Sequence, residues 1–204
     1  MTNRTNETSG LIPKHGGYRN LKSYQTTTLI YDLTVEFCNS YMTYRTNGTN
    51  KSHRTYDQMV QAARSGRQNI AEGCQASGTS KKTELKLIGV ARASLEELLL
   101  DYEDFLRQNS LPFWGKDSPN SRQIRELAYR AYRTNETYRT YLENSENFAN
   151  CLICLIHQAN YLLDRQLGAL EKSFLEEGGF TEKLYQKRMT YRTNSTNKTN
   201  RTYN

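Results

Sequence analysis

The sequence contains little proline, glycine and cysteine, and it has no long uninterrupted apolar run. With 3 Pro and 12 Gly among 204 residues, it is neither collagen-like nor a Pro/Gly low-complexity chain. Its 4 Cys are too few for a disulfide scaffold. The most apolar stretch, residues 152–163, is interrupted by His157, Gln158 and Asn160, so it falls short of the roughly 18 apolar residues of a membrane span. The N-terminus also lacks the apolar segment of a signal peptide, and we therefore expect a soluble, cytoplasmic protein.

A degenerate repeat rich in Thr, Asn, Arg and Tyr interrupts the chain. Residues 42–57 and 189–204 are identical at 12 of 16 positions, and related pieces occur at residues 1–8 and 132–141. Because such a repeat has no apolar face to bury, we interpret its copies as a tandem repeat insertion tolerated in loops and tails. We expect three parts: a low-complexity N-terminal tail over 1–17, a four-helix bundle over 18–185 with repeat-derived loops near 43–56 and 132–142, and a basic repeat-derived tail over 186–204.

Apolar residues between the repeat copies recur at helical spacing. A first helix is predicted over residues 20–42, because spacings of three and four separate its apolar side chains. A second helix is predicted to begin near Asp57, which can act as its N-cap. The inner face of this second helix is small, so it should pack more closely than the others. The inward positions are Ile30, Leu33, Phe37 and Tyr41 in the first helix, and Met59, Ala63, Gly66, Ile70 and Gly73 in the second.

Two further long helices complete the predicted fold. Ser80 is the expected N-cap of the third helix, and residues 121–133 should form a short, Arg-rich helix. The last long helix is predicted over 144–177, where Gly178 and Gly179 end it. Its inward residues are Leu152, Ile156, Ala159, Leu163, Leu167, Leu170 and Phe174, and those of the third helix are Ile88, Ala91, Leu95, Leu98, Tyr102 and Phe105. Without a strand signal, this pattern predicts an all-α, antiparallel up-and-down four-helix bundle with a short extra helix and irregular repeat-derived loops and tails.

The net charge of +7 is distributed unevenly along the chain. Residues 51–92 carry eight basic and three acidic side chains, whereas residues 93–107 carry one basic and five acidic ones. A basic surface favours contact with nucleic-acid phosphates, although Lys and Arg also keep a helix surface soluble. Opposite charges on the two halves further suit head-to-tail contact between copies. The expected nucleic-acid-binding residues are Arg64, Arg67, Lys81, Lys82, Lys86, Arg92, Arg122, Arg125 and Arg130.

Side chains with catalytic or metal-binding patterns are few. Cys151 and Cys154 have metal-like spacing, but a structural zinc site needs four ligands. Cys38, Cys74 and His157 could complete a set, yet free cysteine is common in the apolar helix core. The sequence has no Glu-x-x-His pair, Gly-rich phosphate loop or nucleophile elbow. We therefore expect no metal, no cofactor and no enzymatic activity.

A polar motif lies in the predicted second helix. Ser65, Asn69, Glu72 and Gly73 combine an amide and a carboxylate with small residues, which either locks a tight helix junction or serves a binding surface. Together with residues 87–98, LIGVARASLEEL, this motif resembles the four helix bundle family of the 23S rRNA intervening-sequence proteins. The accessory variability determinant of diversity-generating retroelements is similar. The resemblance covers residues 18–178 in helix order and is specific over residues 59–98, where Ala93 replaces the Gly that is usual in the family.

The resemblance implies a basic bundle that assembles into a ring, a homopentamer, with RNA or an RNA–protein complex as its partner. It carries over no catalytic residues. We therefore expect a non-enzymatic, oligomeric four-helix bundle that binds nucleic acid, structured RNA in preference to DNA, through a basic helix face. The alternative is a protein-interaction scaffold that assembles as a homo-oligomeric ring without nucleic acid and docks an acidic protein. Neither interpretation involves a membrane.

Overall fold

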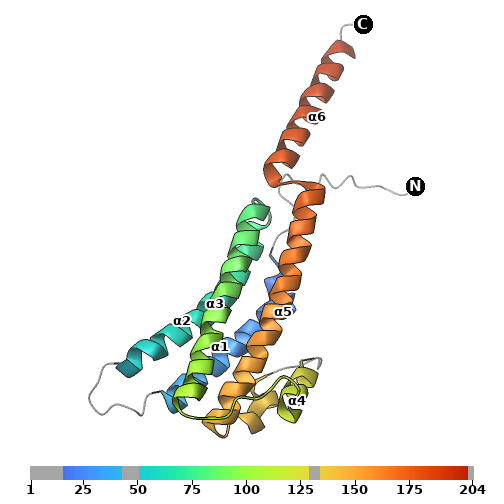
Figure 1. Cartoon of the computed structure of the whole chain (residues 1–204). Coiled ribbons are helices and arrows are strands. Elements are labelled where there is room, and N and C mark those ends of the chain that lie inside the picture. The colour runs from blue at the N-terminus through green and yellow to red at the C-terminus, as the bar shows by residue number, and fades with distance from the viewer. Residues whose placement is uncertain (1–15, 43–50, 129–133, 202–204) are drawn as a thin grey trace.

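Four long helices pack side by side into a bundle. The computed structural model describes residues 16–42, 51–128 and 134–201, and within these ranges it contains helices and no β-strand. The bundle helices are α1 (Lys22–Tyr41), α2 (Lys51–Ala76), α3 (Lys81–Gln108) and α5 (Ser145–Glu177). Helices α1 and α3 each pack against both α2 and α5, and successive bundle helices run in opposite directions (Figure 1). The predicted all-α four-helix bundle is confirmed.

The shorter helices lie at the ends of this bundle. A 3-10 turn, η1 (Tyr18–Asn20), precedes α1. The connection from α3 to α5 contains α4 (Pro119–Leu127) and the 3-10 helix η2 (Asn135–Tyr141), both at the end where α3 finishes (Figure 1). The predicted short helix is therefore present but begins two residues earlier and is over by Ala128, its C-cap. The last helix, α6 (Phe180–Arg201), extends beyond the opposite end of the bundle.

The bundle core consists of the apolar positions that recur at helical spacing. An aromatic cluster lies in the core near the end of the bundle where α1 and α3 finish and α5 begins. There Phe37 of α1 makes edge contacts with Tyr102, Phe105 and Phe148 at centroid distances of 5.1, 4.9 and 5.4 Å. Burying one such side chain contributes about 1.5–3 kcal/mol. Of the predicted inward residues of α5, Phe174 is 36% exposed. It lies in the last turn, at the end of α5 from which α6 continues.

Polar caps fix the helix ends. Ser80 caps α3 and accepts a hydrogen bond from the Thr83 backbone N–H at 3.1 Å, which confirms the predicted start of this helix. Asn144 caps α5 in the same way through Asn147 N–H at 2.8 Å. Gly178 ends α5 with φ of 69°, a left-handed conformation that favours glycine. The predicted glycine stop after residue 177 is thus confirmed.

The predicted start of the second helix is wrong. Helix α2 begins at Lys51, inside the repeat copy, so Asp57 is a helical residue and not an N-cap. Tyr56, from the same copy, packs against the core, and its hydroxyl donates to Asn39 Oδ1 at 3.0 Å. Tyr56 of the repeat copy therefore connects the N-terminal extension of α2 to α1.

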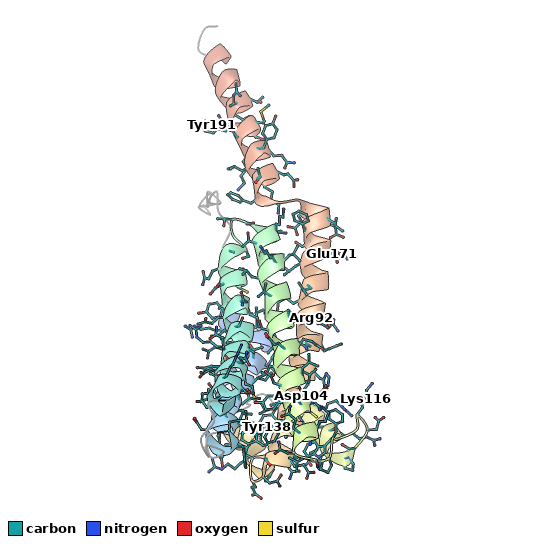
Figure 2. All side chains as sticks on the ribbon, turned by 60° about the vertical axis from the view of Figure 1, so that its left-hand side comes forward. Arg92, Asp104, Lys116, Tyr138, Glu171 and Tyr191 are labelled. Carbon is teal, nitrogen blue, oxygen red and sulfur yellow. The ribbon has the colours of Figure 1, made fainter. Side chains whose placement is uncertain are left out.

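The interpretation that repeat copies lie outside the core is wrong for η2. Tyr138 is fully buried and Tyr141 is 8% exposed, and both belong to the bundle core. Trp114, from the loop after α3, contacts Tyr141 with ring centroids 5.9 Å apart. Figure 2 shows Tyr138 at this end of the bundle. Tyrosine has enough apolar surface to be buried even in a polar repeat, while residues 132 and 133 lie outside the described residues.

The expected C-terminal tail is also helical. Helix α6 includes residues on both sides of the predicted boundary at 185/186, and the chain instead breaks at Gly178 and Gly179. From Thr181 to Asn194 every side chain except the partly buried Leu184 is exposed. Helix α6 is therefore an appendage of the bundle that begins at the glycine pair.

Candidate nucleic-acid interface

The predicted basic residues are distributed over three helices and do not form a single patch. Arg130 lies outside the described residues. The two arginines of α4 are at one end of the bundle, and the first turns of α3 are at the other (Figure 1). The eight described residues are Arg64 and Arg67 on α2, Lys81, Lys82, Lys86 and Arg92 on α3, and Arg122 and Arg125 on α4.

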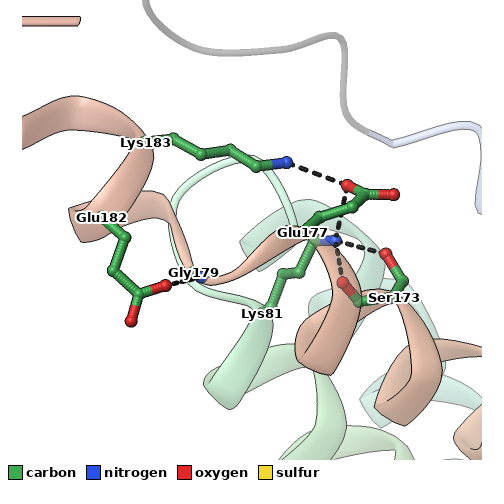
Figure 3. Close-up of polar contacts among 6 residues, drawn as sticks. All are labelled: Lys81, Ser173, Glu177, Gly179, Glu182 and Lys183. Atoms are coloured by element: carbon green, nitrogen blue, oxygen red, sulfur yellow. Dashed lines mark hydrogen bonds and ion pairs between the residues drawn. The ribbon is translucent and has the colours of Figure 1, made fainter. Parts of the chain in front are cut away.

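Lys81 connects α3 to the end of α5. Its ammonium group donates to the Ser173 hydroxyl and, at 3.4 Å, to the Ser173 carbonyl oxygen. It also forms an ion pair with Glu177 at 3.2 Å, and its side chain is only 19% exposed (Figure 3). The structure thus places Lys81 in a helix-joining contact, not on a free phosphate-binding surface.

Arg92 and Arg67 are engaged in a similar way. Arg92 faces α5 (Figure 2), where its guanidinium donates twice to the Asp164 carboxylate and lies 3.8 Å from Glu96. The hydrogen bond to Asp164 raises the pKa of Arg92. Arg67 covers the ring of Tyr31 at 4.2 Å, a cation–π contact between α2 and α1.

Arg64, Lys82 and Lys86 are exposed and have no ion-pair partner among the residues that the structure describes. Lys82 and Lys86 are one helical turn apart on the outer face of α3. At the other end, Arg122 is exposed, whereas Arg125 is partly buried near Cys154. Burial raises the pKa of the Cys154 thiol, and the hydrogen bond with Ser121 and the charge of Arg125 offset this only in part. Of the basic residues that face solvent, Lys82 and Lys86 lie at the start of α3 and Arg122 lies at the opposite end of the bundle. Arg64 lies between these ends, because the next residue, Ser65, contacts Ser94 near the middle of α3.

The outer face of α3 changes sign along its length. Beyond Arg92 it carries Glu97, Asp101 and Asp104. Burial raises the pKa of the Asp101 carboxyl, and the negative charges of Glu97 and Asp104 raise it further. A surface of this kind repels a polyanion. The end of α3 that suits nucleic acid is therefore the one that begins with Lys81 and Lys82.

A chain of hydrogen bonds joins α2 to α3. Asn69 Nδ2 donates to Ser65 Oγ at 3.0 Å, and the hydroxyls of Ser65 and Ser94 lie 2.9 Å apart. Since Ser94 Oγ donates to the Val90 carbonyl oxygen at 3.0 Å, the Ser65 hydroxyl is the donor to Ser94. Every hydroxyl proton in this chain has an acceptor.

This arrangement supports the helix-junction interpretation of the polar motif. A Cβ atom on Gly73 would lie 3.4 Å from the Glu84 carbonyl oxygen, so the glycine allows close approach of the α3 backbone. Glu72 is exposed and faces outward. An open groove of about 870 Å³ runs along the same junction, and its lining includes Gln61, Ser65 and Ser94. Ser94 is not among the predicted site residues, although it lies within the segment 87–98 that carries the resemblance.

The cysteine residues occur apart from any ligand cluster. Burial, aided by the charge of Asp101, raises the pKa of the Cys38 thiol to about 12, and burial also raises the pKa of Cys151. Cys154 lies 3.6 Å from Ser121 Oγ, and His157 is exposed. Among the described residues, no group of three or more His, Cys, Asp or Glu side chains could hold a metal ion.

Comparison with known proteins finds no family model, no curated protein and no solved structure that matches the chain. No match therefore confirms the expected relation to the intervening-sequence family. No described helix is both long enough and apolar enough to cross a membrane.

Proposed function

We propose that this protein is a non-enzymatic helical bundle that binds nucleic acid, with structured RNA as its preferred ligand. Within the bundle, the side chains that contact the nucleic-acid phosphates are Arg64, Lys82 and Lys86. Binding is mainly electrostatic. The resemblance to the intervening-sequence family supports RNA as the ligand and a ring, a homopentamer, as the assembly.

The observation that carries the proposal is that these three cations are exposed and have no ion-pair partner within the described part of the chain. Lys81, Arg67 and Arg92 hold helices together, so binding of phosphate to them would break contacts within the bundle. Binding of phosphate to Arg64, Lys82 and Lys86 would disrupt no ion pair among the described residues. Each such contact releases counterions and gives binding a steep dependence on salt.

Fluorescence anisotropy with a labelled RNA hairpin tests the proposal over 50–300 mM salt. We expect the variant Arg64→Ala/Lys82→Ala/Lys86→Ala to bind at least tenfold more weakly at 100 mM salt. Its slope of log affinity against log salt should fall by about two, since each phosphate contact contributes roughly 0.7–0.9.

The matched control removes the same charge from the other end of the bundle, as Lys116→Ala/Arg122→Ala/Arg139→Ala. This control should lose less than threefold in affinity. A parent protein that does not bind the hairpin at 50 mM salt, or a test variant that binds as well as the parent, refutes the proposal.

The charge reversal along α3 favours a second candidate, a scaffold that assembles head to tail without nucleic acid. Light scattering of the RNA-free protein at 50 and 500 mM salt measures its mass, and acetylation reports whether Lys82 and Lys86 are covered. An assembly that hides both lysines would favour the scaffold, whereas one that leaves them reactive favours RNA binding.

A further inference from the structure

Helix α6 is a positively charged rod outside the bundle core. Over residues 180–194 it carries Lys183, Lys187, Arg188 and Arg192 against a single carboxylate, Glu182. All four basic side chains are exposed, as are Tyr185 and Tyr191 at 65% and 77%. Figure 2 shows Tyr191 well beyond the end of the bundle.

The four cations share one side of the helix. Because each residue advances an α-helix by about 100°, Lys183 and Lys187 fall on one flank of a line through Leu184 and Tyr191. Arg188 and Arg192 fall on its other flank. Glu182 lies on the opposite side of α6. The result is a cationic face, defined by these four basic residues, with an exposed tyrosine along its middle.

The joint between α5 and α6 places Lys183, at one edge of this cationic face, near the start of α3. Glu177 accepts hydrogen bonds from both Lys81 of α3 at 3.2 Å and Lys183 of α6 at 2.9 Å (Figure 3). Glu182 accepts a hydrogen bond from the Gly179 backbone N–H at 2.6 Å and so caps the first turn of α6. Lys183 therefore lies beside the α3 turn that also carries Lys82.

We propose that the cationic face of α6 binds the phosphodiester backbone of nucleic acid and extends the contact surface that begins at Lys82 and Lys86. This inference rests on the proposed function. It adds a second binding element, in which Lys187, Arg188 and Arg192 contact phosphates and Tyr191 stacks on an unpaired base.

Other partners fit α6 less well. Phe180, Leu184 and Tyr191 share one side of α6, but Lys187 and Arg188 interrupt it, and Met189 lies on the other side. A helix–helix interface or a membrane-surface helix needs a continuous apolar face. The charge of α6 instead complements a polyanion, because four exposed cations on one side face a single carboxylate on the other.

The test uses the full chain and the variant Lys187→Ala/Arg188→Ala/Arg192→Ala, with anisotropy on an RNA hairpin, a single-stranded RNA and a DNA of the same sequence. We expect at least a tenfold loss of RNA affinity at 100 mM salt and a fall in salt slope of about two. Lys187→Arg/Arg188→Lys/Arg192→Lys keeps the charge and should bind within twofold of the parent. Far-UV circular dichroism confirms that both variants remain helical.

Tyr191→Ala separates stacking from charge. It should weaken binding of single-stranded RNA about fivefold or more and leave the salt slope unchanged, because stacking on an aromatic ring involves no counterion release. Equal loss on a fully paired duplex would contradict the role assigned to this tyrosine.

The outcomes distinguish this inference from the proposed function. Loss of affinity in the Arg64/Lys82/Lys86 variant with none in the α6 variant overturns the role of α6 and leaves the bundle surface in place. Loss in the α6 variant alone shows that α6 binds without the bundle cations. An α6 variant that binds RNA normally but has a smaller mass by light scattering overturns the inference in favour of a second copy as the partner.

Discussion

At the scale of single residues, Gly66 is the described glycine of the bundle helices that leaves the least room for a side chain. A Cβ atom there would lie 2.8 Å from Leu95 Cδ2 and 3.0 Å from Leu95 Cγ, and Leu95 is fully buried. We expect Gly66→Ala to lower the free energy of unfolding by about 1 kcal/mol. Overpacking by the added methyl group destabilises by about 1–3 kcal/mol. The higher helix propensity of Ala offsets about 1 kcal/mol of this.

Gly89 is the matched control, because nothing lies within 4 Å of the position of its Cβ. Gly89→Ala should raise the free energy of unfolding by about 0.5–1 kcal/mol through propensity alone. Urea unfolding followed by circular dichroism measures both changes. Equal effects of the two substitutions would show that α2 and α3 are not in the close contact described above.

The hydrogen-bond chain of Ser65, Asn69 and Ser94 predicts a stability effect without a binding effect. Ser94→Ala leaves the Ser65 hydroxyl without its acceptor, so we expect a loss of about 1 kcal/mol in unfolding free energy. Ser65→Ala/Ser94→Ala should cost less than the sum of the single substitutions, as expected for partners in one network. RNA affinity measured by anisotropy should stay within twofold of the parent value. A larger change would show that this motif belongs to the RNA-binding surface.

The basic residues show what sequence reasoning misses at this scale. Lys81 and Arg92 were expected to face nucleic acid with Lys82 and Lys86, yet they pair with residues far along the chain, Glu177 and Asp164. Helical periodicity tells which positions share a face, but it does not tell which residue of a distant helix lies opposite. Lys82 and Lys86 could be predicted as exposed because they lie outside the apolar stripe of their own helix.

At the scale of elements, helix starts with a local signal could be predicted. Ser80 and Asn144 satisfy backbone N–H groups within three residues of themselves, so the sequence alone contains the cap and its partner. The start of α2 could not be found in this way, since the Tyr56 hydroxyl that favours the additional turn bonds to Asn39 of α1. Helix α6 has no continuous apolar stripe, since Lys187 and Arg188 interrupt the side that carries Leu184 and Tyr191, and apolar periodicity therefore does not predict it.

Two carboxylates near the joint of α3, α5 and α6 predict opposite responses to pH. Hydrogen bonds from Lys183 and Lys81 lower the pKa of Glu177 to about 2, so its contribution is present above its ordinary value of 4.5 and is lost as pH falls toward 2. Burial raises the pKa of Glu84, and the charge of Lys81 only partly offsets this. Glu84 thus destabilises the fold above its raised pKa, and acidification relieves that penalty.

We expect Glu177→Gln to be less stable than the parent at pH 7 and equally stable near pH 2. Glu84→Gln should be more stable than the parent at pH 7, with the difference disappearing below pH 4.5. Thermal unfolding across this range measures both. Because Glu177 is exposed, 1 M salt should reduce its effect, whereas the burial effect of Glu84 should persist. Parallel pH profiles for the two variants would contradict these assignments.

At the scale of the whole molecule, one repeat-derived segment packs in the bundle core and another lies outside it. Tyr138 in η2 is fully buried in the core, and its truncation in Tyr138→Ala should lower the free energy of unfolding by about 3–5 kcal/mol. Deletion of residues 180–204 removes a largely exposed helix and the surface ion pair of Lys183 with Glu177. Such a pair contributes about 0–1 kcal/mol, so the urea midpoint should barely move.

The same deletion also tests whether stability and RNA binding reside in different parts of the molecule. If the bundle provides stability and α6 provides a separate binding element, the shortened chain should unfold in one cooperative transition at the parent midpoint and yet lose RNA affinity at least tenfold at 100 mM salt. Tyr138→Ala should show the reverse at low temperature, with a lower midpoint and near-parent affinity while it remains folded. A deletion that lowers the midpoint as far as Tyr138→Ala does would mean that α6 belongs to the cooperative unit, and its cationic face would then be covered in the folded protein.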